Sequence, residues 1–143
     1  MATAREMFPS GKYMGRLAGG EDLLEELKRV CSDHWVTMGR IEAIGAVERA
    51  RLGYYDQEAR EYRFNEIDQR LEIVSCIGNV SLLGEEALVH AHVVLADAGG
   101  RAFGGHLAPG TVLFAGEFFL EAFSGESLRR EPDEATGLPL WKL

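Results

Sequence analysis

The chain has 143 residues, of which 46% are hydrophobic and 27% are charged, which fits one globular domain with a single core. Its 23 acidic and 15 basic residues give a formal net charge of −8. This disfavours nucleic-acid binding, because such surfaces neutralise phosphates with lysine and arginine. No stretch approaches the ~20 apolar residues of a membrane span and no apolar signal segment opens the chain, so we expect a cytoplasmic protein without a membrane partner.

The N-terminal part of the chain predicts one short strand and one helix. Residues 12–20 read as the strand, which glycines close. Residues 21–31 then place apolar side chains along one helix face, at Leu23, Leu24, Leu27, Val30 and Cys31. No other segment predicts a helix convincingly.

The remaining segments read as strands, because they are rich in β-branched and aromatic residues and broken by glycines. They cover residues 35–55, 61–64, 70–83, 87–96, 101–107 and 111–123. Gly45 is expected at a bulge or bend, and the Asp-Ala-Gly-Gly run at 97–100 predicts a hairpin turn. The tail from residue 130 has two prolines and no periodicity, so it is expected as an ordered wrap or a loose end.

This pattern predicts an α+β fold in a single domain over residues 1–143, with a mainly antiparallel sheet and one main helix. The last predicted strand is apolar on both faces, since it carries Phe114, Phe118, Phe119 and Phe123. A strand of this kind is buried on both sides, within the fold or against another subunit.

The two cysteines, Cys31 and Cys76, are far apart and form no Cys-x-x-Cys pair. We therefore expect free thiols rather than a disulfide, and neither residue is expected to bind a metal.

Three of the four histidines lie between residues 89 and 106. His90 and His92 are two apart in a predicted strand, so they point to the same face. The hairpin turn places His106 across from His92 if it shares that face. Three imidazoles without a fourth protein ligand form an open metal site, for which zinc is the first expectation. The alternative is that these are ordinary polar strand residues.

An enzyme built on such a metal needs a general acid or base nearby. Glu72 and Glu117 are the candidates because both are embedded in apolar strands, although a strand residue that faces solvent or a subunit partner fits Glu72 better. Asn79, next to Gly78, is a candidate ligand-binding residue, with the alternative that it holds a bend in the strand.

Five stretches recur in the order of a known family: GRIEAIGAVERARLGYYD, LEIVSCIGNVSL, VHAHVVLADAGGRAFGGHL, GEFFLEAF and RREPDEATGLPL. Together they resemble the plant and prokaryote conserved (PPC) domain, of the free-standing prokaryotic type. The resemblance runs from about Tyr13 to Leu140. It includes the Gly-Gly-His of the family at residues 104–106 and its C-terminal Arg, Asp and Thr-Gly-Leu signature.

The resemblance implies a seven-stranded antiparallel sheet with one helix, a homotrimer, and a metal held by histidines in some prokaryotic members. It also implies that Glu117 matches a strand glutamate common among those members. Free-standing members often carry a DNA-binding label. The plant proteins bind DNA through an AT-hook, however, and this chain has no Arg-Gly-Arg-Pro core of that motif.

Three functions follow as hypotheses. The first is a metal-binding homotrimer whose site at His90, His92 and His106 holds an unidentified small ligand. The second is a zinc-dependent hydrolase or lyase, and the third is a DNA-associated regulator. The histidines favour the first two, and the net charge of −8 weighs against the third.

Overall fold

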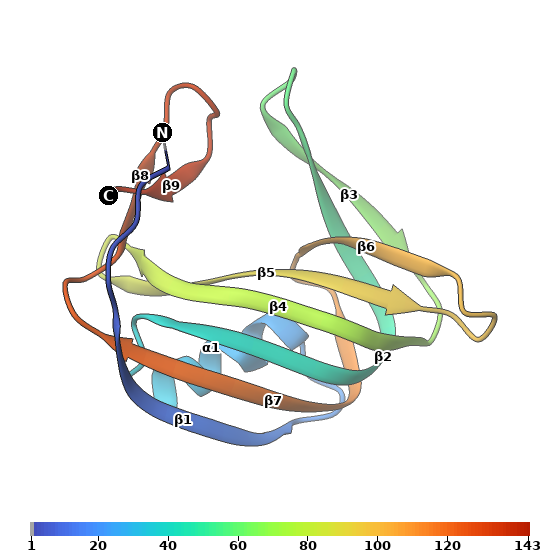
Figure 1. Cartoon of the computed structure of the whole chain (residues 1–143). Coiled ribbons are helices and arrows are strands. Elements are labelled where there is room, and N and C mark those ends of the chain that lie inside the picture. The colour runs from blue at the N-terminus through green and yellow to red at the C-terminus, as the bar shows by residue number, and fades with distance from the viewer. Residues whose placement is uncertain (1) are drawn as a thin grey trace.

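The computed structural model describes residues 2–143, which form one helix and nine strands (Figure 1). The elements in chain order are β1 Phe8–Leu17, α1 Leu23–Asp33, β2 Gly39–Asp56, β3 Glu61–Ile67, β4 Leu71–Leu83, β5 Glu86–Ala96, β6 Ala102–Leu107, β7 Val112–Ser124, β8 Arg129–Pro132 and β9 Pro139–Trp141.

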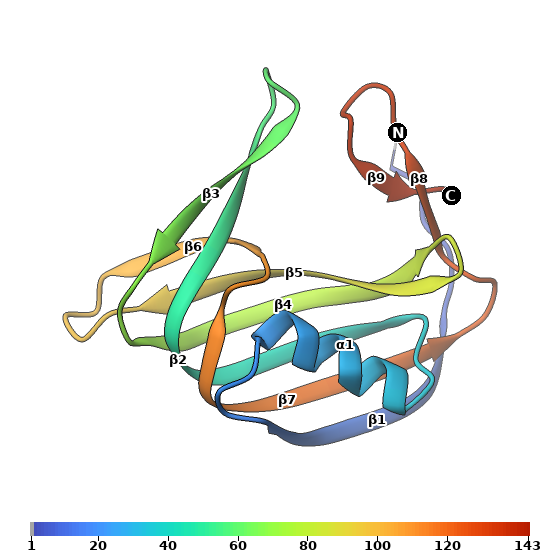
Figure 2. The same ribbon diagram turned by 180° about the vertical axis from the view of Figure 1, so that it is seen from behind.

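Helix α1 forms where the apolar periodicity predicts it. Its N-terminus is capped by Asp22, whose side chain accepts a hydrogen bond from the Glu25 backbone N–H at 3.1 Å. The apolar face packs against one side of the sheet (Figure 2). At 11 residues α1 is too short to cross a membrane, so no helix within residues 2–143 can do so.

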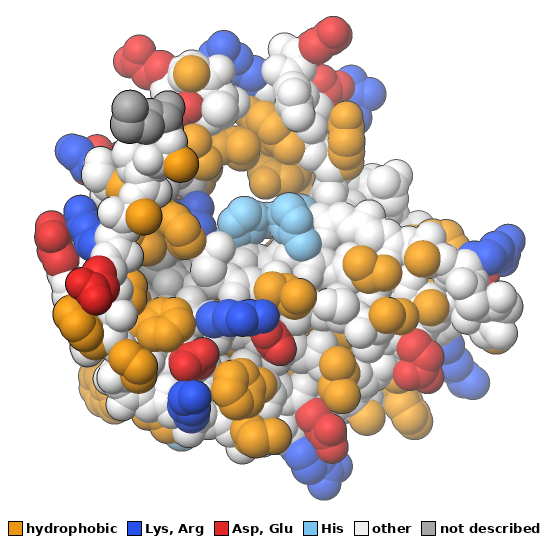
Figure 3. Space-filling view, in the orientation of Figure 1, with side chains coloured by type: hydrophobic (Ala, Val, Ile, Leu, Met, Phe, Trp, Pro, Cys, Tyr) orange, Lys and Arg blue, Asp and Glu red, His pale blue; other side chains and the backbone are white. Residues whose placement is uncertain are grey.

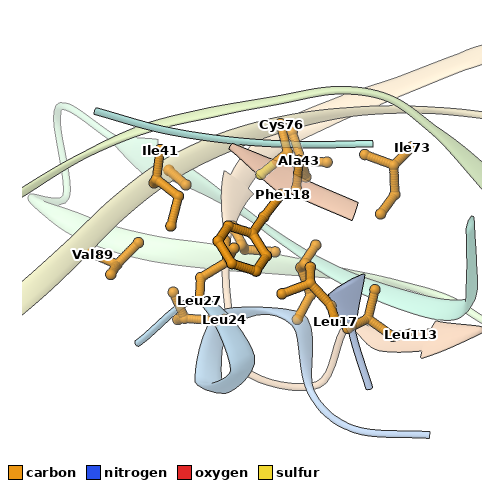
Figure 4. Close-up of a cluster of buried hydrophobic side chains, with 14 of the residues drawn as sticks. Leu17, Leu24, Leu27, Ile41, Ala43, Ile73, Cys76, Val89, Leu113 and Phe118 are labelled. Atoms are coloured by element: carbon orange, nitrogen blue, oxygen red, sulfur yellow. The ribbon is translucent and has the colours of Figure 1, made fainter. Parts of the chain in front are cut away.

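The core lies between α1 and that side of the sheet, where Leu24 and Leu27 of the helix lie near Ile41, Cys76 and Phe118 of the strands (Figure 4). Along the strands, residues that face the core alternate with residues that face the opposite side of the sheet. The helix does not cover that opposite side. We call this opposite side the outer face.

Cys31 and Cys76 are free thiols, as predicted, and both are buried in this core. Burial raises the pKa of each thiol to about 12. They therefore remain protonated at neutral pH and behave as small apolar residues.

Strand β2 organises the sheet, because it pairs with β3, β4, β6 and β7. Its first half pairs with β4, while Leu52 and Gly53 near its end pair with Leu107 and His106 of β6. Since β4 also pairs with β5 and β5 with β6, the strands β2, β4, β5 and β6 form a closed ring of pairings. Gly45 lies at a register shift between β2 and β4, as the sequence predicts.

The sheet has nine strands where the resemblance implies seven, and it is mixed rather than purely antiparallel. The two additional strands, β8 and β9, form a short hairpin, and β8 runs parallel to β4. The tail is therefore an ordered wrap. Strands of four and three residues are too short to show an alternating pattern, and Pro132 and Pro139, which face each other at the end of this hairpin, mask it further.

Replacement of Gly45 by alanine is expected to destabilise the fold. Its φ is +144°, a conformation that side chains rarely adopt, and a Cβ would lie 2.8 Å from the Gly116 Cα. We expect Gly45→Ala to lower the free energy of unfolding by at least about 2 kcal/mol in urea denaturation. Gly104→Ala is the matched control, because its Cβ would meet no atom closer than 3.4 Å; equal losses for both variants would contradict this account.

Candidate metal centre

The three histidines converge on the outer face of the β5–β6 hairpin. His92 lies directly across from His106 in the register, and His90 lies two residues earlier on the same side of β5. One nitrogen from each ring lies within 4.8 Å of the others. The ring centroids are 5.1 Å apart for His90–His92 and for His90–His106, and 5.7 Å for His92–His106. Small side-chain rotations would bring three such nitrogens to the ~2.0–2.1 Å that zinc requires.

The register that places His106 depends on the turn at the end of the hairpin. The Asp97 carboxylate accepts hydrogen bonds from the backbone N–H groups of Gly99 and Arg101, each at 2.9 Å. Gly100 takes a φ of +79°, which glycine adopts without strain. The edge of β6 that does not pair with β5 faces β2. There, a Cβ on Gly105 would lie 2.8 Å from the Gly53 carbonyl oxygen. Glycine at 105 therefore allows β6 to lie close to β2.

The environment keeps at least two of the rings neutral. Burial lowers the pKa of His90 to about 4, and the charges of His106, Arg130 and His92 lower it further in that order. The pKa of His106 is lowered by burial and then by His92. Neutral imidazoles offer lone pairs to a metal at pH 7. The Nδ1 atom of His106 is buried without a hydrogen-bond partner among residues 2–143, so the donor set fits a bound cation.

Two projections rise above β4 and β5, and β5 carries His90 and His92 (Figure 1). One is the end of the β2–β3 hairpin, and the other is the β8–β9 hairpin. They meet where the Tyr55 hydroxyl donates to the Thr136 carbonyl at 2.7 Å and the Arg60 guanidinium donates to the Glu134 carbonyl at 3.1 Å. Pale-blue histidine side chains line the floor of the hollow between the projections (Figure 3).

A cavity of about 790 Å³ adjoins the histidines, within the size range of small-molecule sites. His90, His92 and Asn79 line one part of it. The apolar part of its lining comes from Ala4, Met7, Met38, Ile77, Val80, Phe123, Leu128, Trp141 and Leu143. The site is therefore open on one side to a molecule larger than water.

Arg130 is the residue of this region that reasoning from the residues themselves missed. It is only 8% exposed. Its guanidinium donates to Ser81 Oγ at 2.9 Å, to the Pro139 carbonyl at 2.8 Å and to Asn79 Oδ1 at 2.8 Å. The C-terminal signature of the resembled family includes an arginine in this stretch, which was the one signal that pointed to it.

The other candidate residues from the sequence do not all lie at the histidine cluster. Asn79 lies across from His90 in the β4–β5 register, and its side-chain oxygen holds Arg130. Glu72 and Glu117 are both exposed. Glu117 lies on β7 beside Ile44 of β2, so β2 and β4 separate it from β5. It is not part of the histidine cluster, and its catalytic role stays a prediction.

Known proteins share this fold and more than a third of the aligned residues. The family model for the Plants and Prokaryotes Conserved (PCC) domain matches residues 5–124. A metal-containing protein from Archaeoglobus fulgidus superposes with a TM-score of 0.93 at 38% identity, covering 99% of this chain and 100% of that one. A plant- and prokaryote-conserved (PPC) protein from Pyrococcus horikoshii gives 0.93 at 34% identity, covering 99% and 98%.

A curated relative is larger. The bifunctional protein GlmU of a Synechococcus strain is 37% identical over 127 residues, which are 87% of this chain. The chain spans only 19% of the length of that relative. The similarity therefore concerns one domain of a longer protein.

The stability of the metal-free protein is expected to depend on pH through His90. An unfolded histidine takes up a proton near pH 6.5, whereas folded His90 does so only at about 4. Its contribution is therefore fully present above pH 6.5 and is lost as the pH falls from 6.5 towards 4. We would measure the free energy of unfolding by urea denaturation at pH values of about 7, 5.5 and 4.5. It should fall more steeply with falling pH for wild type than for His90→Gln. The carboxylates titrate in both proteins, so equal slopes would contradict the assignment to His90.

Proposed function

The chain belongs to the Plants and Prokaryotes Conserved domain family, and from this premise we propose that it is a homotrimeric metal-binding protein. His90, His92 and His106 hold one divalent transition ion, zinc in the first instance, and leave a coordination position for a small ligand. The observation that carries the proposal is the convergence of three imidazole nitrogens within 4.8 Å. The metal-containing relative from A. fulgidus, at 38% identity over nearly the whole chain, supports it.

The donor set accounts for the choice of ion. Three neutral imidazoles suit zinc, copper, nickel or iron, and three protein ligands leave the fourth position of a tetrahedral zinc site free. When bound, such an ion supplies Lewis-acid chemistry to whatever occupies that position.

The residues around the histidines orient the rings and shape the ligand space. The Tyr62 ring packs on His106 with centroids 4.7 Å apart, which restricts the rotation of that imidazole. The cavity beside His90 and His92 gives a ligand room on one side. Asn79 holds Arg130 next to that cavity.

Ligand binding has more support here than hydrolysis or DNA binding. Among the described residues, no aspartate or glutamate side chain lines the cavity, so a hydrolase or lyase would lack an obvious general base. DNA binding is opposed by the net charge of −8, which assembly into a trimer would multiply. Both alternatives stay hypotheses.

The metal site is tested by the composition of the purified protein. We expect one divalent transition ion per chain by elemental analysis, and His92→Ala should remove most of it because two imidazoles bind zinc much more weakly than three. His34→Ala is the matched control, since this fourth histidine lies at the end of α1 and stacks on Tyr13. Metal retained by His92→Ala, or lost equally from His34→Ala, would contradict the site.

The outer face supports the homotrimer. It carries several exposed apolar side chains on three neighbouring strands, outside the cavity: Ile44, Val74 and Phe114. Phe118 of β7 is buried in the core, whereas Phe114 is 67% exposed. One face of β7 is therefore buried against the core, while Phe114 has no such cover among residues 2–143. Apolar clusters of this kind on a small domain commonly mark subunit interfaces.

Light scattering is expected to give a mass of three times 15.8 kDa. Ile44→Lys, which places a charge among the exposed apolar side chains of the outer face, should shift the mass towards one chain. Trp35→Ser is the control, because Trp35 is 90% exposed and follows α1, away from the outer face. A wild-type protein that remains monomeric at micromolar concentration would exclude the trimer.

A further inference from the structure

We propose that the cavity beside the histidines binds an organic carboxylate with an apolar or aromatic body, and that Arg130 recognises its charge. This inference rests on the proposed function, because the metal and Arg130 would flank the same ligand. It adds a ligand class and a specificity-determining residue to the site.

The first observation is that Arg130 is a buried cation and that no carboxylate of residues 2–143 serves as its counter-ion. Three of its five N–H donors are used, and all three acceptors are neutral: a serine hydroxyl, a backbone carbonyl and an asparagine oxygen. No carboxylate lies within ion-pairing distance of it among residues 2–143. An arginine that is 8% exposed loses most of its hydration, which is costly unless an anion replaces it.

The missing partner stands out because the chain has acidic residues in excess. Of its 143 residues 23 are acidic, and other arginines near this cavity do have partners. Arg5 pairs with Glu126 and Arg40 pairs with Glu42. Arg130, which lies behind the cavity lining, differs from both because no carboxylate of residues 2–143 pairs with it.

The second observation is the position of this charge. Arg130 donates to Asn79, which lies opposite His90 in the sheet and lines the cavity. Its guanidinium carbon lies 5.3 Å from the centre of the Trp141 ring, which also lines the cavity. Arg130 does not itself line the cavity, but it lies directly behind two side chains that do, Asn79 and Trp141.

The third observation is the character of the cavity. Its volume of about 790 Å³ exceeds what a hydrated inorganic anion needs. Met38, Ile77, Phe123, Leu128 and Trp141 supply an apolar wall, and Asn79, which holds Arg130, lines another part of the cavity. No aspartate or glutamate side chain from the described part of the chain would repel an anion there. An apolar wall with a buried cation behind Asn79 matches a carboxylate attached to an apolar or aromatic body.

Recognition by Arg130 is therefore by charge, exerted from behind Asn79, which lines the cavity. A carboxylate is attracted by this charge, whereas a neutral amide of the same shape is not. The ligand should therefore be preferred over its own amide. A purely structural arginine, which only holds β8 and β9 against β4, would give no such preference.

Trp141 provides the readout. The chain has two tryptophans, and Trp35→Phe leaves Trp141 as the one reporter in the cavity. We would titrate this zinc-loaded protein with 4-phenylbutyrate and with 4-phenylbutyramide, following the fluorescence. The acid is expected to bind at least about 10-fold more tightly than the amide, which is the scale of the attraction between a carboxylate and a partly desolvated cation a few ångströms away. Equal affinities would overturn the proposal.

Asn79→Asp is the sharpest variant, because it is almost isosteric and gives Arg130 a carboxylate partner within the protein. The acid–amide preference should then fall to about 2-fold or less, while the melting temperature rises as the buried cation gains a counter-ion. Arg130→Gln should abolish the preference in the same way. A preference that survives in either folded variant would overturn the proposal.

Arg40→Gln is the matched control, since Arg40 lines the same cavity but already pairs with Glu42. It should leave the preference unchanged, and a loss as large as that of Asn79→Asp would show that general charge, not Arg130, selects the ligand. Elemental analysis of every variant separates this inference from the metal site. If wild type holds no metal the proposed function fails, while the acid–amide preference of the metal-free protein still tests Arg130.

Discussion

The pairing of β2 with four other strands is the constraint on which the remaining structure depends. One strand of 18 residues can contact β7 and β4 along its first half and β6 and β3 along its second only if it bends. Gly45 provides the bend, at a register shift in β2 where this strand pairs with both β4 and β7. The bend carries the end of β2 to β6, closes the ring of strands and fixes β6, with His106, against β5. A metal site built from two adjacent strands thus depends on a glycine far from it in the sequence.

Desolvation links the geometry of the site to its chemistry. The ring of strands and the two projections limit the access of water to His90, His106 and Arg130, and in each case burial is the largest cause of a lowered pKa. For the histidines the consequence is neutrality, which metal binding requires. For Arg130 it is an unbalanced charge, because a guanidinium stays protonated in proteins even when burial lowers its pKa. Desolvation thus favours neutral histidines for metal binding and leaves Arg130 with an uncompensated positive charge.

The sequence predicts those parts of the site that depend on local geometry. The two-residue spacing of His90 and His92 sets their common face, and the turn at 97–100 sets the position of His106, so their convergence could be expected. Helix α1 and the bend at Gly45 follow from equally local patterns. Arg130 differs because its partner Asn79 is 51 residues away, and the strand that carries it has four residues. No periodicity relates two such positions, and only the parallel pairing of β8 with β4 brings them together.

The C-terminal hairpin has two roles that make opposite demands on Arg130. As a structural residue, Arg130 links β8 to Ser81 and Asn79 of β4 and to Pro139 of β9. A carboxylate partner within the chain would strengthen that link, and an acidic chain could readily supply one. Three neutral acceptors instead hold the side chain in place while leaving its charge uncompensated. That arrangement gives up stability in the isolated chain and retains electrostatic attraction for a molecule in the cavity, which is the usual relation between stability and function at a binding site.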